Sequence, residues 1–101
     1  VAAEQKETAK GAKPKIDAAL KSLANAKQLA DLGGGAMQYG ALVDHHITTL
    51  QQLATSCASV LAGEEGARLP EGLSTTKAIN GEITTGQKTA SFVSQQCKQR
   101  A

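Results

Sequence analysis

The chain has 101 residues, two cysteines and a formal net charge of +2, which fits a single domain. It contains one tyrosine, one phenylalanine and no tryptophan. Dispersed lysines with almost no stacking rings do not make a nucleic-acid-binding surface, so we expect no nucleic-acid partner.

The first 13 residues contain good helix formers but no apolar stripe. We expect residues 1–13 to form an N-terminal extension or a frayed helix, followed by a single helical bundle domain over residues 14–101. Lys6, Lys10 and Lys13 form a row at helical spacing. This row is expected to be a solvated face, and contact with an acidic partner is the alternative.

An amphipathic helix is predicted after Pro14, because proline suits the first turn of a helix. Ile16, Leu20 and Leu23 recur three or four residues apart, which is the spacing of one helix face. The pattern ends at Leu32, before three consecutive glycines. These glycines favour a left-handed cap and a tight reversal into the next helix.

The next helix is predicted from about Ala36 to Leu61. Its apolar stripe alternates strictly between spacings of four and three residues: Tyr39, Val43, His46, Leu50, Leu53, Cys57 and Val60. Asp44 is the only charged residue between Asp31 and Glu64. Because a helix with so little charge is expected to be covered on more than one side, we predict that it is the central helix.

Residues 62–75 form a long loop that is rich in turn residues, and long loops often carry function. Glu64, Glu65, Leu69 and Glu71 are the candidate contacts for a partner protein. Leu69 either anchors that partner or packs into the core of the chain itself, and we expect the second.

The last helix is predicted to start near residues 74–76, or near Gly81 if Asn80 and Gly81 interrupt it. Its stripe again alternates between four and three residues: Ile79, Ile83, Gly86, Ala90, Val93 and Cys97. The sequence therefore predicts an all-α fold, a small bundle of three to four helices.

Cys57 and Cys97 both fall on apolar stripes and should point inward. We predict a disulfide between them, which would contribute about 4 kcal/mol in the chain-entropy model. One alternative is that both cysteines are free, buried thiols. The other is a disulfide between two chains, which would give a dimer. A disulfide needs Cα atoms within about 7 Å, so the last helix would have to run roughly parallel to the central one.

A disulfide is typical of exported proteins, so we predict a periplasmic or secreted location. The chain begins at Val1 without methionine, as a mature protein does after signal removal. The absence of an N-x-S/T sequon favours a bacterial periplasm. No stretch is apolar enough to span a membrane, while a lipid tether upstream of Val1 stays open.

The triplet Asp44, His45 and His46 is the only concentration of catalytic residue types. Adjacent helical residues point about 100° apart, and neither histidine has a ligand partner three or four residues away. No serine of this helix has a histidine within reach on the same face. We therefore predict a protein without a metal, a cofactor or catalytic residues, and hence no enzyme.

The expected function is an exported, non-enzymatic helical module that binds another protein, as an accessory, inhibitor, immunity or secretion-assembly factor. The alternative is a carrier of an apolar ligand such as haem or lipid, with Tyr39 and His46 lining the site, because both side chains can be axial haem ligands. The chain is expected to be a monomer or a small homo-oligomer, and a structural oligomer joined through a cysteine is a third class.

Overall fold

The computed structural model describes residues 3–32 and 37–100. Three helices occupy most of them: α1 (Ala3–Leu32), α2 (Met37–Leu61) and α3 (Thr76–Arg100), and no strand occurs in these two ranges. The bundle is 48 Å long and 20 by 19 Å across. The predicted all-α fold is confirmed, with three helices rather than four. The glycine cap expected at residues 33–35 lies outside the described residues.

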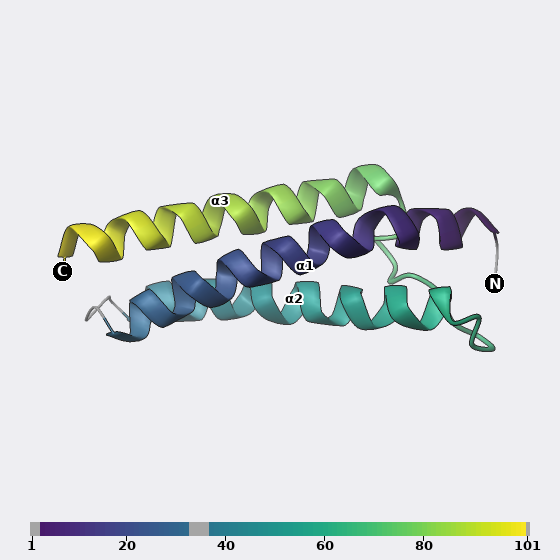
Figure 1. Cartoon of the computed structure of the whole chain (residues 1–101), viewed down its shortest axis with the longest axis horizontal. Coiled ribbons are helices and arrows are strands. Elements are labelled where there is room, and N and C mark those ends of the chain that lie inside the picture. Colours follow the sequence, from purple (N-terminus) through teal and green to yellow (C-terminus); the bar gives the residue numbers. More distant parts are fainter. Residues whose placement is uncertain (1–2, 33–36, 101) are drawn as a thin grey trace.

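The three helices run up, down and up along one axis (Figure 1). α2 is antiparallel to α1, and α3 returns parallel to α1. α1 packs closely against both other helices, whereas α2 and α3 approach each other least. The prediction that the charge-poor α2 is the central helix is therefore wrong.

Alanine explains why α1 takes the shared position. Its buried residues are Ala9, Ala12, Ile16, Ala19, Leu23, Ala26 and Ala30. Small side chains let neighbouring helix axes approach closely, because little volume stands between the backbones. The alanines of α1 therefore allow both α2 and α3 to pack against this helix.

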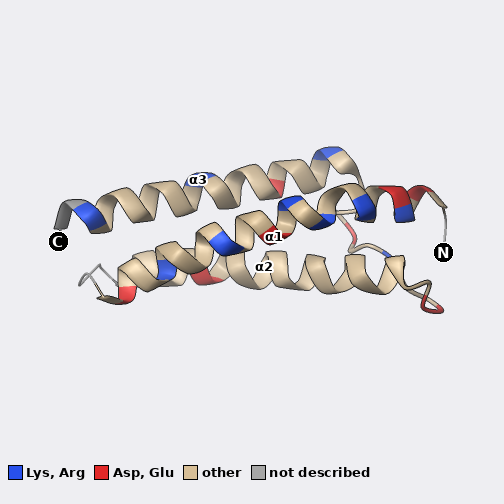
Figure 2. Cartoon of the chain, viewed as in Figure 1, with Lys and Arg blue, Asp and Glu red and all other residues tan. Residues whose placement is uncertain are grey.

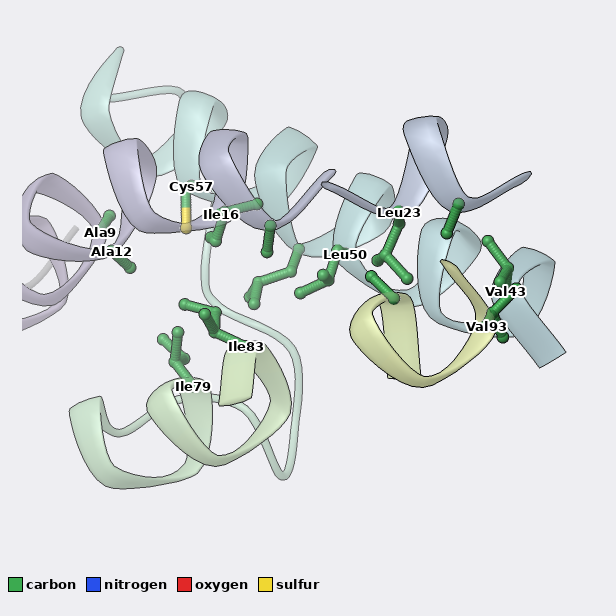
Figure 3. Packing of buried hydrophobic residues seen from close by; sticks show 14 of the residues in the cluster. Ala9, Ala12, Ile16, Leu23, Val43, Leu50, Cys57, Ile79, Ile83 and Val93 are labelled. Carbon is green, nitrogen blue, oxygen red and sulfur yellow. The ribbon is translucent and has the colours of Figure 1, made fainter. Parts of the chain in front are cut away.

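All three helices bury a stripe that repeats every seven residues, which is the pattern of left-handed coiled-coil packing. Figure 3 shows members of each stripe pointing into the space that the helices enclose. Gly86 marks a close approach, since a Cβ atom there would lie 3.3 Å from Leu50 Cδ1 and 3.5 Å from Leu23 Cδ1. One residue from each helix therefore meets at this level.

α1 begins at Ala3, well before Pro14, so residues 3–13 are continuous with the rest of this helix. Ala9 and Ala12 are buried, at 0% and 6% exposure. Sequence analysis missed this part of the stripe because alanine carries little weight as an apolar residue. The extra turns cover the end of the bundle from which the loop after α2 departs (Figure 1).

α3 begins at Thr76 and passes through Asn80 and Gly81 without a break. Thr75 caps it, since its Oγ1 accepts a hydrogen bond of 3.1 Å from the Ala78 amide. The earlier of the two predicted starts is therefore correct.

The predicted disulfide is wrong. Cys57 and Cys97 are both buried and both free. Cys57 lies near Lys13 of α1, whose charge acts on its thiol. Cys97 precedes Lys98, which lines a cleft together with Leu29 of α1. Because Lys13 and Leu29 are about 24 Å apart along α1, the two cysteines lie at different levels of the bundle, far beyond the reach of a disulfide.

The predicted parallel arrangement of the last two helices falls with the disulfide, because α3 runs antiparallel to α2 (Figure 1). Both cysteines do point inward as the stripes predicted. They lie toward opposite ends of the same core, and their exposures of 0% and 2% leave neither thiol open to a second chain.

Candidate functional site

The loop between α2 and α3 is built from consecutive turns. Gly63 has a φ of 72° and ends α2, with its amide bonded to the Val60 carbonyl and the Glu64 amide bonded to the Ser59 carbonyl. This pair of bonds is the Schellman motif, which requires a left-handed residue at the position of Gly63. A further turn follows, in which the Ala67 amide donates to the Glu64 carbonyl.

Leu69 holds this loop against the bundle. Its side chain is 3% exposed, and its amide donates a hydrogen bond of 3.1 Å to Gln5 Oε1. The expectation that Leu69 packs into the core is confirmed, so it is not an exposed anchor for a partner. Together with Gln5 and Glu71, it lines a shallow cleft of about 440 Å³.

Three carboxylates stand on this anchored loop. Glu64, Glu65 and Glu71 are exposed, and we call them the acidic loop. None forms an ion pair with a residue in the described ranges. Figure 2 shows this negative charge beyond the end of α2, which itself carries almost no charge. The three carboxylates of the acidic loop therefore face solvent, and no cation of the described ranges neutralises their charge.

The Asp44, His45 and His46 triplet diverges, as helical geometry predicts. Asp44 Oδ2 accepts a hydrogen bond of 2.9 Å from Lys27 Nζ on α1. His46 faces α3 instead, with its Nδ1 3.3 Å from Glu82 Oε1. The ring of His45 stands edge-on to that of His46, with centroids 5.2 Å apart. Within residues 3–32 and 37–100, no cluster of three His, Cys, Asp or Glu side chains is arranged to hold a metal ion.

Tyr39 and His46, the candidate ligand-binding residues, both contact α3. The rings of Tyr39 and Phe92 meet edge to face with centroids 5.9 Å apart, and His46 is 8% exposed beside Glu82. Neither residue lines the clefts between α1 and α3 or the cleft at the loop. These contacts give both side chains a role in joining two helices and do not favour the carrier hypothesis, which stays untested.

Phe92 and Glu82 were missed by sequence analysis as partners of Tyr39 and His46. Both flank the apolar stripe of α3, next to Val93 and Ile83. A flanking position indicates proximity to a neighbouring helix. The flanking position does not identify the residue of the neighbouring helix that it contacts, because that contact depends on the register between the two helices.

Within the described ranges, two titratable groups have a pKa shifted from the ordinary value. Burial raises the pKa of the Cys57 thiol, and the nearby charge of Lys13 acts in the opposite direction. The hydrogen bond to Asp44 raises the pKa of Lys27. Cys57 is thus held as a neutral thiol, which makes it a poor nucleophile.

No helix in the described part of the chain combines the length and the apolar character needed to cross a bilayer. No protein-family model matches the chain, and no curated protein or solved structure is significantly similar to it. Function must therefore be argued from the residues themselves.

Proposed function

We propose that this protein is a non-enzymatic helical module that binds a partner protein through the acidic loop. The observation that carries the proposal is a set of exposed carboxylates without an internal ion pair, held on a loop that the core anchors at Leu69. A fixed loop loses less conformational entropy on binding than a free one, so its charges are available for recognition.

The expected partner surface is basic, because complementary charge steers association and selects against other partners. Leu69 acts in this scheme by positioning the loop and not by touching the partner. An accessory, inhibitor, immunity or secretion-assembly role fits such a module. A periplasmic or secreted location stays a prediction, and the free cysteines remove its main support.

The test compares two double variants of equal charge. Glu64→Gln with Glu65→Gln alters the acidic loop, whereas Glu4→Gln with Glu7→Gln removes the same charge from the first turns of α1. Partners captured by the unaltered chain would be purified and their Kd values measured by calorimetry. We expect the loop variant to bind about tenfold more weakly.

The control variant should bind nearly as the unaltered chain does, and both variants should keep the same Tm, since exposed substitutions change stability little. Equal weakening by the two variants would mean that net charge, and not the acidic loop, governs binding. Failure of the unaltered chain to retain any partner would also contradict the proposal.

A further inference from the structure

A second candidate contact surface, besides the acidic loop, lies along the line where α1 and α3 meet. Three open clefts follow one another there, with volumes of about 80, 550 and 480 Å³. We call this row of clefts the α1–α3 groove. Hydroxyl and amide side chains from both helices line it, among them Ser22, Asn25, Asn80, Thr84, Ser91 and Ser94. These side chains give the groove donors and acceptors of hydrogen bonds, between apolar lining residues such as Leu29, Ile83 and Ala90.

Lysines border the α1–α3 groove on both helices. Lys15 lines two of the clefts and Lys98 lines the third. Lys21, Lys77 and Lys88 each stand three or four residues from a cleft-lining residue of the same helix, which places them on the same face. None of these five lysines is ion-paired to a carboxylate of the described ranges.

Two of the nearby carboxylates form pairs away from the groove. Asp17 pairs with Lys13, and Glu82, the only acidic residue of α3, faces His46 of α2. Glu7, at one end, is the only acidic residue that lines the three clefts. The groove therefore carries a net positive charge, because the five lysines outnumber the carboxylates beside them, and a docked anion would relieve the repulsion among these lysines.

We propose that the α1–α3 groove binds an acidic polypeptide segment of another protein. Carboxylates of that segment pair with the bordering lysines, and its backbone amides and carbonyls bond to the hydroxyl and amide side chains of the groove. Charge complementarity selects the sign of the partner. The binding is screened by salt, since most of the lysine charge is exposed.

The placement of the aromatic rings favours a polypeptide over a glycan or a nucleic acid. Sugar rings and unpaired bases commonly stack on aromatic side chains. The chain has only Tyr39 and Phe92. These two rings pack edge to face between α2 and α3, and neither lines one of the three clefts. A peptide needs hydrogen bonds and charge but no stacking platform, and the groove supplies both.

This surface has the opposite charge to the acidic loop, so it takes a different kind of partner. The proposal stands whether or not the acidic loop binds a protein. Figure 2 shows the lysines spread along α1 and α3, while the carboxylates of the loop lie beyond the C-terminal end of α2 and on the segment that returns to α3.

Binding of poly-L-glutamate to the full chain, followed by fluorescence anisotropy, tests the proposal. The groove variant combines Lys15→Gln and Lys98→Gln, which line the clefts. The control variant combines Lys6→Gln and Arg68→Gln, which removes the same charge from two exposed side chains that line none of the three clefts. At low salt we expect the groove variant to bind about tenfold more weakly and the control to change by less than about twofold.

Amide chemical shifts map the same contact independently. On addition of poly-L-glutamate, the largest changes should fall on Thr84, Ser91 and Ser94. Equal weakening by the two variants, or shifts spread over all three helices, would overturn the proposal because net charge alone would explain the binding. Absence of binding to poly-L-glutamate at low salt would also overturn it.

Heparin and a single-stranded oligodeoxynucleotide complete the comparison. Tighter binding of either polyanion than of poly-L-glutamate, with the same loss in the groove variant, would reassign the groove to a glycan or a nucleic acid and overturn the polypeptide assignment. Circular dichroism of both variants should match that of the unaltered chain, because the four substituted side chains are exposed.

Discussion

His46 of α2 and Glu82 of α3 face each other across the least closely packed pair of helices, with 3.3 Å between Nδ1 and Oε1. The side chain of His46 is 10% exposed and that of Glu82 is 23% exposed. A mostly buried imidazole needs a partner for its ring nitrogen. The pair therefore helps to set the register of α3 against α2.

Removal of this carboxylate should lower stability. Glu82→Ala leaves the His46 ring without its partner in a mostly buried site, and we expect a loss of about 1–2 kcal/mol in the free energy of unfolding. Glu82→Gln keeps an acceptor and should lose less. Urea unfolding measures both, with the exposed Glu71→Ala as the matched control. A loss from Glu82→Ala no larger than that of the control would contradict the role of the pair.

Helix periodicity predicted burial well. Each residue of the α2 stripe from Val43 to Val60 is buried, and so is each residue of the α3 stripe from Ile79 to Cys97. Burial within a helix follows from spacing alone, because residues three or four apart share a face. These stripes could therefore be assigned before any contact between helices was known.

Topology could not be derived in the same way. The disulfide prediction treated two inward-pointing cysteines as neighbours, although a helix of 25 residues has inward positions at every level of the bundle. Pairing of Cys57 with Cys97 or of His46 with Glu82 depends on helix direction and register, which periodicity does not encode. The α1–α3 groove was missed for the same reason, since its two walls are far apart in sequence.

Two glycines of α3 should respond to substitution in opposite directions. Gly81 has open space around its missing Cβ, whereas Gly86 faces Leu50 and Leu23. We expect Gly81→Ala to stabilise the protein by about 0.5–1 kcal/mol, because alanine favours the helix. Gly86→Val should destabilise it by about 1–3 kcal/mol through overpacking. Thermal unfolding gives both values, and a stabilising Gly86→Val would refute the close approach of the helices.

Two free thiols should be found in the purified protein. The intact mass should not change on reduction, and a non-reducing gel should show no cross-linked dimer. Iodoacetamide should label Cys57 and Cys97 slowly in the native protein, because both are buried, and rapidly in denaturant. A mass about 2 Da lower without reductant would show that the two cysteines are bonded and that the helices pack differently.

Stability should fall at alkaline pH through Cys57. Burial raises the pKa of this thiol above its ordinary value of 9.0, so the folded state keeps a proton that the unfolded state releases. The contribution of this proton to stability is fully present below about pH 9 and is lost as the pH rises toward the folded pKa.

The comparison is between the unaltered chain and Cys57→Ala, each unfolded in urea at a series of pH values from neutral to strongly alkaline. The variant should be less stable at neutral pH, because it leaves a small cavity in the core. Its stability should nevertheless decline less steeply than that of the unaltered chain once the thiol begins to ionise. Parallel declines would show that Cys57 ionises as readily in the folded state as in the unfolded one, contrary to its burial between α1 and α2.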